Sequence, residues 1–280
     1  MIKIFTTLKD FQDYRKNIGT PKVGIVPTMG NLHEGHLSLL KCSLDENDVS
    51  VITIFVNPKQ FGPNEDFNTY PRTLDQDIAK ISNIAFTAKS ETVVFAPSSL
   101  EDIYPPGFNT TISVKGVTSK LEGAFRPTHF DGVTTVVYRL FSIVKPQNAY
   151  FGQKDFQQCV VIKKMIEDLE LGINFVRMPI IRNSEGLALS SRNQYLSEKE
   201  RVDALILSRT LKQIEHLILQ KDDYRSYINE CLSDKNWDYL DVLDASDLSE
   251  PKAKSHELVV IGTYRMGSTR LLDNTVVSIL

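Results

Sequence analysis

Two histidines, three residues apart around a glycine, mark the segment Pro27-Thr28-Met29-Gly30-Asn31-Leu32-His33-Glu34-Gly35-His36. At the start of a helix, His33 and His36 share one face. A helix N-terminus also offers unpaired backbone N–H groups and the positive end of the helix dipole, and both attract phosphate. Two imidazoles there can donate hydrogen bonds to phosphate oxygens as charge builds up during displacement at phosphorus. The segment therefore predicts phosphate chemistry.

Other interpretations of these histidines are weaker. A histidine that only caps a helix is commonplace, so a structural role is the alternative for either ring. A zinc protease motif separates its histidines by four positions, whereas His33 and His36 are three apart. A Walker-type phosphate loop is absent from the sequence.

Further polar groups follow other predicted strands. Asn57 and Gln60 carry amides that both donate and accept, which suits a hydroxy acid with a carboxylate, although surface amides are the alternative. Lys154 can neutralise phosphate, and Asp155 can hold ribose hydroxyls, orient Lys154 or only cap its helix. The run Ser190-Ser191-Arg192 offers two hydroxyls and a guanidinium to the β- and γ-phosphates of a nucleotide, or forms a solvated turn.

The elements expected to position these residues alternate between strand and helix. Apolar and β-branched runs predict strands at residues 23–26, 49–56, 92–96, 149–152 and 175–181. Helical periodicity predicts helices from His33 or Glu34 to about residue 44, and around residues 74–85, 133–144 and 156–169. Such alternation is typical of a parallel sheet covered on both faces, with ligands bound at the carboxyl ends of its strands.

The pattern changes after about residue 182. Residues 183–186 form a predicted turn, and Ser197 with Glu200 reads as a capping box that opens one long helix with a buried face across residues 205–218. A helix at about residues 224–233 and strands near 239–243, 258–263 and 276–280 complete the pattern. We therefore predict an α/β domain over residues 1–182 and a smaller α+β domain over residues 183–280.

Composition limits the functional classes. The 280 residues carry a net charge of −3, with acidic and basic residues mixed, which argues against a non-specific nucleic-acid or membrane-surface binder. Three cysteines, far apart, indicate neither a disulfide framework nor a zinc knot and favour a reducing compartment. Without a secretory signal or a membrane-spanning apolar stretch, the expected location is the cytoplasm.

Five sequence blocks in order resemble one family. The histidine segment resembles the HxGH nucleotidyltransferases, and the other blocks narrow the resemblance to the pantothenate synthetase (pantoate–β-alanine ligase) family. These blocks are Phe55-Val56-Asn57-Pro58-Lys59-Gln60-Phe61-Gly62, Glu122-Gly123-Ala124-Phe125-Arg126-Pro127, Phe151-Gly152-Gln153-Lys154-Asp155-Phe156-Gln157-Gln158 and Leu187-Ala188-Leu189-Ser190-Ser191-Arg192-Asn193. Residues 22–196 match densely, and the C-terminal third matches loosely through Leu271-Leu272-Asp273-Asn274.

The resemblance implies a Rossmann-like catalytic domain with a smaller C-terminal lid domain, and a homodimer formed through the N-terminal domain. It implies two steps: pantoate attacks the α-phosphorus of ATP, and the amine of β-alanine then attacks pantoyl adenylate, giving pantothenate and AMP. The catalytic residues implied are His36, His33, Lys154 and Arg192. ATP-binding residues implied are Pro27, Met29, Gly30, Asn31, Leu32, His33, Glu34, Gly35, His36, Gly152, Gln153, Lys154, Asp155, Ile181, Leu189, Ser190, Ser191 and Arg192. The residues implied to bind pantoate and β-alanine are Asn57, Gln60 and Gln158.

Some details of the resemblance stay open. The family commonly has Glu at the position of Gln153 and Gly at that of Thr128, within a segment in which Arg126 and His129 suit a lid. Mg²⁺ is implied by the ATP chemistry, with Asp75 and Asp77 as candidate ligands. Phe61 and nearby apolar residues can cover the geminal methyl groups of pantoate.

Two rival functions use other chemistry. An adenylyltransferase or cytidylyltransferase would keep the ATP site and stop after nucleotidyl transfer, but Gln60 and Gln158 argue against this. A synthetase-like module that binds RNA without catalysis would need a basic or aromatic platform, which the sequence lacks.

Overall fold

The computed structural model describes residues 2–63 and 65–279. Packing divides the chain into two compact units: Met1–Gly152 with Val161–Met178, and Gln153–Val160 with Pro179–Leu280. The predicted domain boundary after residue 182 stays a prediction, and each unit is described by itself.

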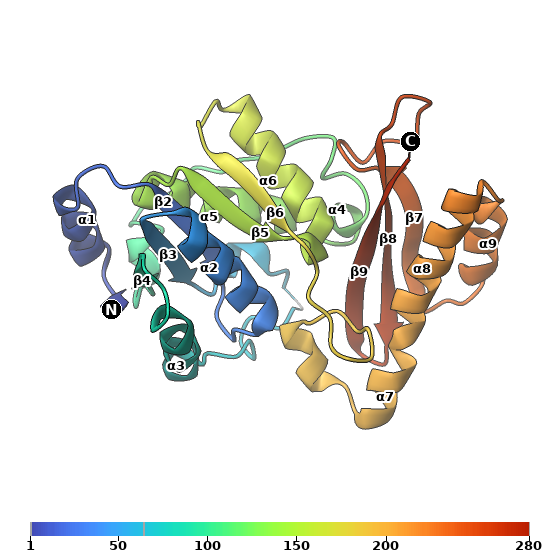
Figure 1. The fold of residues 1–280 in the computed structure, drawn as a ribbon, viewed down its shortest axis with the longest axis horizontal. Helices are drawn as coiled ribbons and strands as arrows, with labels where there is room; N and C mark the ends of the chain where they lie inside the picture. The colour runs from blue at the N-terminus through green and yellow to red at the C-terminus, as the bar shows by residue number, and fades with distance from the viewer. Residues whose placement is uncertain (1, 64, 280) are drawn as a thin grey trace. The chain divides into compact units, whose positions relative to one another are not determined.

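The first unit contains a six-stranded sheet in which every pair is parallel, with the strand order β1-β4-β3-β2-β5-β6 (Figure 1). The strands are β1 Ile2–Phe5, β2 Val23–Thr28, β3 Val49–Ile54, β4 Glu91–Phe95, β5 Asn148–Gly152 and β6 Asn174–Met178. The chain moves outward from β2 through β3 and β4, and then crosses to β5 and β6 on the other side of β2. This reversal places a topological switch point at the carboxyl ends of β2 and β5. The predicted Rossmann-like parallel sheet is confirmed.

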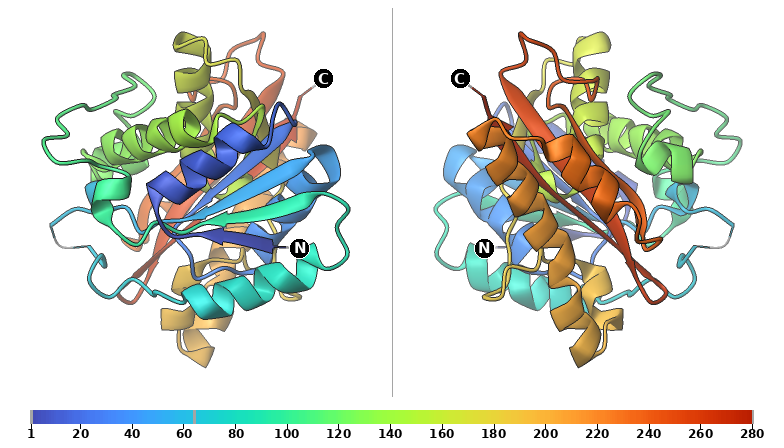
Figure 2. Two further views of the ribbon diagram at one scale, coloured as in Figure 1. Left: turned by 90° about the vertical axis from the view of Figure 1, so that its left-hand side faces the viewer. Right: turned by 90° about the vertical axis from the view of Figure 1, so that its right-hand side faces the viewer.

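Helices cover both faces of this sheet because its strands are buried on both sides. Val94 of β4 joins the apolar cluster under α2 and α3, whereas its neighbour Phe95 faces the other way and stacks on Phe11 of α1 at 4.6 Å. Figure 2 shows α1 and α5 on one face and α3 on the other. The helices that pack on or follow these strands are α1 Leu8–Asn17, α2 Glu34–Glu46, α3 Leu74–Ala85, α5 His129–Val144 and α6 Phe156–Asp168, with the short helices η1 Pro58–Gln60, η2 Leu100–Asp102, η3 Gln153–Asp155 and α4 Glu122–Phe125.

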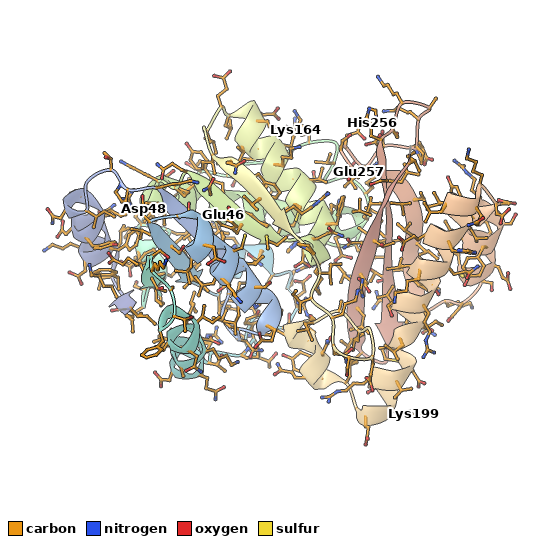
Figure 3. The ribbon with its side chains drawn as sticks, in the orientation of Figure 1. Glu46, Asp48, Lys164, Lys199, His256 and Glu257 are labelled. Carbon is orange, nitrogen blue, oxygen red and sulfur yellow. The ribbon has the colours of Figure 1, made fainter. Side chains whose placement is uncertain are left out.

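Buried hydrogen bonds fix the C-terminal end of α2 on the sheet. Asn47 donates to Tyr150 Oη at 2.7 Å, and Tyr150 donates to Glu46 at 2.8 Å. Asp48, just beyond the helix, accepts from the backbone N–H of Lys22 at 2.7 Å (Glu46 and Asp48 are labelled in Figure 3). These bonds set the position of α2 and therefore of the histidines at its other end.

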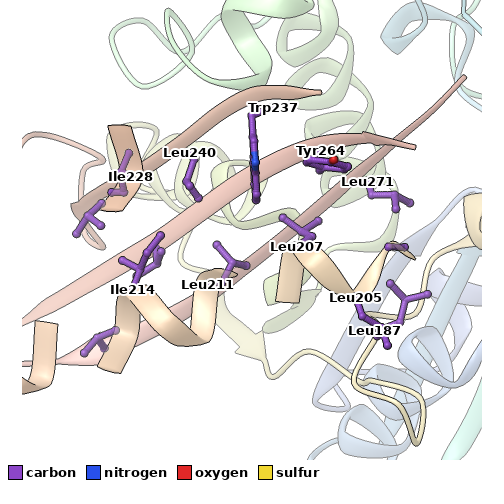
Figure 4. Packing of buried hydrophobic residues seen from close by; sticks show 14 of the residues in the cluster. Leu187, Leu205, Leu207, Leu211, Ile214, Ile228, Trp237, Leu240, Tyr264 and Leu271 are labelled. Carbon is purple, nitrogen blue, oxygen red and sulfur yellow. The ribbon is translucent and has the colours of Figure 1, made fainter. Parts of the chain in front are cut away.

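The second unit contains an antiparallel sheet, β7 Trp237–Asp244, β8 Glu257–Met266 and β9 Thr269–Ser278, in that order. Its helices are α7 Glu198–Asp203, α8 Leu205–Gln220 and α9 Tyr224–Cys231, preceded by the short helix η4 Ser191–Tyr195. Leu211 and Ile214 of α8 face Trp237 and Leu240 of β7 in one apolar core (Figure 4). The predicted α+β composition is confirmed.

Several predicted boundaries are wrong. The helix predicted to run on from Ser197 is two helices: α7 buries no side chain, and α8 begins after Ala204, where residues enter the core. The last strand begins at Thr269 rather than 276, because a two-residue loop at 267–268 turns β8 straight into β9. The strand predicted to reach residue 181 ends at Met178, before Pro179, which has no N–H to donate. Residue 280, at the end of the predicted last strand, lies outside the described residues.

The first strand and helix were missed. β1 has only four residues, Ile2-Lys3-Ile4-Phe5, and none of them is fully buried. The start of α1 did carry a signal, since the Thr7 hydroxyl caps the helix by accepting from Asp10 N at 3.2 Å.

Candidate active site

The two histidines occupy the N-terminus of α2, directly after β2. His33 is the N-cap residue, and its Nδ1 accepts from the backbone N–H of Gly35 at 3.1 Å. His36 Nδ1 accepts in turn from the backbone N–H of His33 at 3.4 Å, and the ring centroids lie 4.1 Å apart. Because Nδ1 accepts a hydrogen bond in both rings, each neutral imidazole carries its proton on Nε2. The capping role and the predicted donor role are therefore compatible.

The close approach of the His33 ring to Gly35 explains why a glycine separates the two histidines. A Cβ at this position would lie 2.8 Å from His33 Cε1 and 2.9 Å from His33 Nδ1. Both distances are shorter than a van der Waals contact, so a larger residue would push the His33 ring out of its cap. The glycine keeps the two rings together.

The loop between β2 and α2 is held by Asp77, a fully buried side chain of α3. Its Oδ1 accepts from the N–H of Leu32 at 2.7 Å, and its Oδ2 accepts from the N–H of Asn31 at 2.9 Å and from Thr73 at 3.1 Å. Gly30 and Asn31 both have positive φ, 85° and 48°, which is the bend that turns these N–H groups toward Asp77. Asp77 therefore orders the loop, and the expectation that it is a metal ligand is not supported; Asp75 is exposed on the same helix.

Asn57 and Gln60 follow β3 and lie side by side, but they are exposed differently. Asn57 is only 1% exposed, and its Nδ2 donates to Gln60 Oε1 at 3.0 Å and to the carbonyl of Gly132 at 3.1 Å. Tyr104 donates to Asn57 Oδ1 at 2.8 Å. Gln60 is half-buried, and its Nε2 lies 3.2 Å from Met29 Sδ. The buried Asn57 thus orients the Gln60 side chain, and its predicted contact with substrate stays a prediction.

The main chain of Gln60 is held by the segment predicted as a lid. Arg126 donates to the carbonyl of Gln60 at 3.2 Å and forms a two-pronged ion pair with Glu65, at 2.7 and 2.6 Å. His129 Nδ1 donates to the same carbonyl at 2.9 Å. Burial, and then the charge of Arg126, lower the pKa of His129 to about 4, so the ring is neutral at physiological pH. Burial would raise the pKa of Glu65, but its hydrogen bonds and attraction to Arg126 lower it.

Gly132 is a functional position that the sequence analysis missed. A Cβ there would lie 2.2 Å from the carbonyl oxygen of Lys59 and 2.6 Å from the backbone nitrogen of Gln60. The glycine therefore allows α5 to approach the Gln60 loop closely. Its position directly before the apolar stripe of the helix predicted over residues 133–144 was the available signal.

In the second unit, three of the predicted phosphate-binding residues line one small pocket: Lys154, Ser190 and Arg192. Lys154 Nζ lies 3.3 Å from Asp155 Oδ1. Ser190 caps η4 by accepting from the N–H of Arg192 at 3.3 Å, so Arg192 lies in the first turn of η4. The fold therefore brings together two segments that are about 35 residues apart in the sequence, as expected for a site built on loops.

The remaining predicted residues lie as follows. Ile181 and Leu189 pair through their backbones at 2.9 Å, which forms a hairpin that leads to Ser190. Gly152 ends β5, Gln158 is half-buried on α6, and Glu34 is exposed in the first turn of α2. Phe61 packs edge-on against Tyr70, 5.8 Å between ring centroids.

Pro27 is the fifth residue of β2, paired with Thr53 of β3, and Ser191 is the first residue of η4. Among residues 2–63 and 65–279, no group of three or more His, Cys, Asp or Glu side chains is arranged to hold a metal ion. No helix in this described part is both long and apolar enough to span a membrane.

Comparison with known proteins shows which family the chain belongs to. The family model for pantoate-beta-alanine ligase matches residues 3–276. The chain belongs to this family. The pantothenate synthetases of Acetivibrio thermocellus and Hydrogenovibrio crunogenus are 46% and 45% identical to it; the first alignment covers all of this chain and 99% of the relative, and the second covers 99% and 98%.

Solved structures of the pantoate-beta-alanine ligase family have the same fold. The enzyme from Thermus thermophilus superposes with a TM-score of 0.89 at 38% identity, covering 98% of this chain and 99% of that one. The ligase from Francisella tularensis, complexed with beta-gamma ATP and beta-alanine, gives a TM-score of 0.73 at 34% identity, covering 98% and 97%.

Both departures from the pantoate-beta-alanine ligase pattern have a structural explanation. Thr128, where Gly is common, has φ −102° and ψ −4°, a conformation open to any residue. Gln153, where Glu is common, donates through Nε2 to Asn274 Oδ1 at 3.2 Å. Neither change strains the backbone described here.

Proposed function

We propose that this chain condenses (R)-pantoate with β-alanine at the expense of ATP, giving pantothenate, AMP and pyrophosphate, and so supplies a precursor of coenzyme A. The observation that carries the proposal is the match of residues 3–276 to the ligase family. The paired histidines at the N-terminus of α2 support it, because they suit the first half of that chemistry.

The first step is displacement at the α-phosphorus of ATP. A pantoate carboxylate oxygen forms the new P–O bond, and pyrophosphate leaves with the electrons of the broken one. His33 and His36 carry Nε2–H groups at a helix N-terminus, where they can donate to oxygens that gain charge. Their contribution is larger in the transition state than in the bound substrate, and this difference accelerates the step.

Gln60 is the residue proposed to bind pantoate. Its side chain is oriented by Asn57, and its backbone carbonyl is held by Arg126 and His129. A pre-ordered amide loses little conformational freedom when it binds a hydroxy acid, so it can place the carboxylate for attack. Gln158 on α6 is proposed as the second pantoate amide.

Lys154, Ser190 and Arg192 are proposed to bind the β- and γ-phosphates as pyrophosphate forms. They share one pocket of the second unit and supply an ammonium, a hydroxyl and a guanidinium, all of which can donate to phosphate oxygens. In the second step the β-alanine amine attacks the acyl carbon of pantoyl adenylate, and AMP leaves.

Mg²⁺ is proposed to accompany ATP, where it neutralises phosphate charge. Asp77 does not fit as its ligand, because both carboxylate oxygens already accept hydrogen bonds inside the fold. We therefore expect the ion to be held mainly by the phosphates and water.

Three further expectations belong to this proposal. We propose a homodimer, residues 1–182 as the catalytic domain and 183–280 as the smaller lid domain, and a cytoplasmic location. Free thiols at Cys42, Cys159 and Cys231 support a reducing compartment. Light scattering on the purified chain tests the dimer, which a monomeric mass would exclude.

The function is tested by incubating the chain with ATP, Mg²⁺, pantoate and β-alanine and identifying the products. Equal amounts of pantothenate and AMP are expected. A dinucleotide product without AMP would instead identify a nucleotidyltransferase, and no turnover together with tight RNA retention at physiological salt would favour an RNA-binding module.

A further inference from the structure

Asn274 of β9 holds the main chain that carries Lys154. The Asn274 side chain is 1% exposed, and its Nδ2 donates to the carbonyls of Gln153 at 2.9 Å and of Lys154 at 3.0 Å. Gln153 Nε2 donates back to Asn274 Oδ1 at 3.2 Å. One buried amide therefore makes three hydrogen bonds to two consecutive residues, and these fix where the Lys154 side chain begins.

Its neighbour Asp273 holds the other phosphate-binding segment. Asp273 is 3% exposed and accepts two hydrogen bonds from Arg182, at 2.6 and 2.8 Å. Arg182 also donates to the carbonyl of Gly186 at 3.1 Å. Arg182 and Gly186 belong to the hairpin that ends at Leu189, directly before Ser190, so Asp273 fixes the base of the loop that carries Arg192.

The hydrogen bonds of Asp273 and those of Asn274 form one connected network. Asp273 Oδ1 also accepts from the backbone N–H of Asn274 at 2.8 Å, and Arg182 donates to the carbonyl of Asn274 at 3.4 Å. All of these groups lie in the second unit. A buried network of this kind is costly to leave half-satisfied, so it resists displacement of either segment.

We infer that Asp273 and Asn274 are positioning residues for the pyrophosphate-releasing step, holding the Lys154 backbone and the Arg192 loop in one arrangement. The inference rests on the proposed function, because it assigns phosphate binding to Lys154 and Arg192. Asp273 also lines the pocket that Lys154, Ser190 and Arg192 share, but both of its carboxylate oxygens accept from Arg182, so its part, like that of Asn274, is to hold the residues that bind phosphate.

The test compares Asn274→Asp with Val277→Ala. The first variant keeps the shape of the side chain but replaces the N–H donor with an acceptor that faces two carbonyls. The second variant shortens Val277, a side chain of the same strand that is 2% exposed. It serves as the matched control for lost stability. For each variant, the KM for ATP, the pantoate-dependent exchange of pyrophosphate into ATP, and the turnover of supplied pantoyl adenylate with β-alanine are measured per folded molecule.

Asn274→Asp is expected to raise the KM for ATP and slow the exchange by about tenfold, while turnover of supplied adenylate changes less than about twofold. Val277→Ala is expected to leave all three values unchanged. Equal loss of both half-reactions in Asn274→Asp, or unchanged values, would overturn the inference. If wild-type protein shows no pantoate-dependent exchange, the proposed function fails instead, and the two failures are thereby distinguished.

A milder variant keeps the test decisive if Asn274→Asp does not fold. Arg182→Lys keeps the positive charge but cannot make both of the hydrogen bonds that the guanidinium donates to Asp273. We expect the KM for ATP to rise by about two- to threefold, while the turnover of supplied pantoyl adenylate stays unchanged. No change in the KM would contradict the positioning role.

Discussion

At the scale of single residues, the histidine segment combines capping with the proposed chemistry in the same two rings, at different ring nitrogens. Nδ1 of His33 and of His36 accepts a backbone N–H, which leaves Nε2 of each ring as the donor. The sequence predicted the pair and the helix it begins. It did not predict Asp77 as the anchor of the loop, because that contact spans 46 positions and no local pattern encodes it.

Replacing either histidine should separate the two half-reactions. His36→Ala and His33→Ala are each expected to slow pantoyl adenylate formation by roughly 10²–10³, the effect of losing a transition-state donor. Turnover of supplied adenylate with β-alanine should suffer less, since no pyrophosphate leaves in that step. Half-reaction rates and melting temperature are measured together; a variant that loses stability but keeps its rate per folded molecule would refute a catalytic role for that histidine.

Gly35→Ala tests the geometry of the pair. Alanine favours a helix over glycine by up to about 1 kcal/mol, which offsets much of the cost of losing the His33 cap, so stability should change little. The new Cβ would nevertheless displace the His33 ring, and adenylate formation should fall by about tenfold or more. Lys41→Ala, an exposed change on the same helix, is the control. Wild-type rates in Gly35→Ala would show that the capped ring position does not matter.

At the scale of elements, the strands and helices were predicted where local chemistry is strong. β2, α2 and β3 were predicted from apolar runs and helical periodicity, although β2 continues through Pro27 to Thr28, beyond its predicted end at residue 26, and the four-residue β1 was missed. The hydrogen bonds that hold the backbone carbonyl of Gln60 could not be predicted, because their donors, Arg126 and His129, lie 66 and 69 positions away in the sequence. The segment predicted as a lid packs against the Gln60 loop.

Because α5 approaches the Gln60 loop closely at Gly132, a larger residue at this position is predicted to disturb the loop. Gly132→Ala should force α5 and the Gln60 backbone apart, lowering stability by about 1–3 kcal/mol and raising the KM for pantoate more than that for ATP. Urea unfolding and steady-state kinetics measure the two effects. Ser142→Ala, on the exposed side of α5, is the control. Equal changes in both KM values would show that the damage is not confined to the Gln60 loop.

His129 predicts a pH dependence of stability. An unfolded histidine has a pKa near 6.5, and burial beside Arg126 lowers the pKa of His129 to about 4. Between these values the unfolded state binds a proton that the folded state does not, so the free energy of unfolding falls as the pH drops from about 6.5 to about 4. His129→Asn retains an N–H donor and cannot titrate, so its stability should depend less on pH in this window. Urea unfolding at several pH values checks this, and identical pH profiles would contradict it.

At the scale of the whole molecule, the proposed function assigns different residues to each of the two units. The first unit presents two histidines and an ordered glutamine, and the second presents Lys154, Ser190 and Arg192 in one pocket. The order of sequence blocks indicated all of these residues. The division of the chain was harder to predict, because Gln153–Val160 packs with the C-terminal residues although it follows β5 directly.

The most direct test of the central claim is exchange of labelled pyrophosphate into ATP by the wild-type chain. If the chain forms pantoyl adenylate before it uses the amine, exchange should require pantoate and Mg²⁺ but should proceed without β-alanine. Adding β-alanine should then release AMP and pantothenate in equal amounts. Exchange that occurs without pantoate, or that requires β-alanine, would contradict the two-step mechanism.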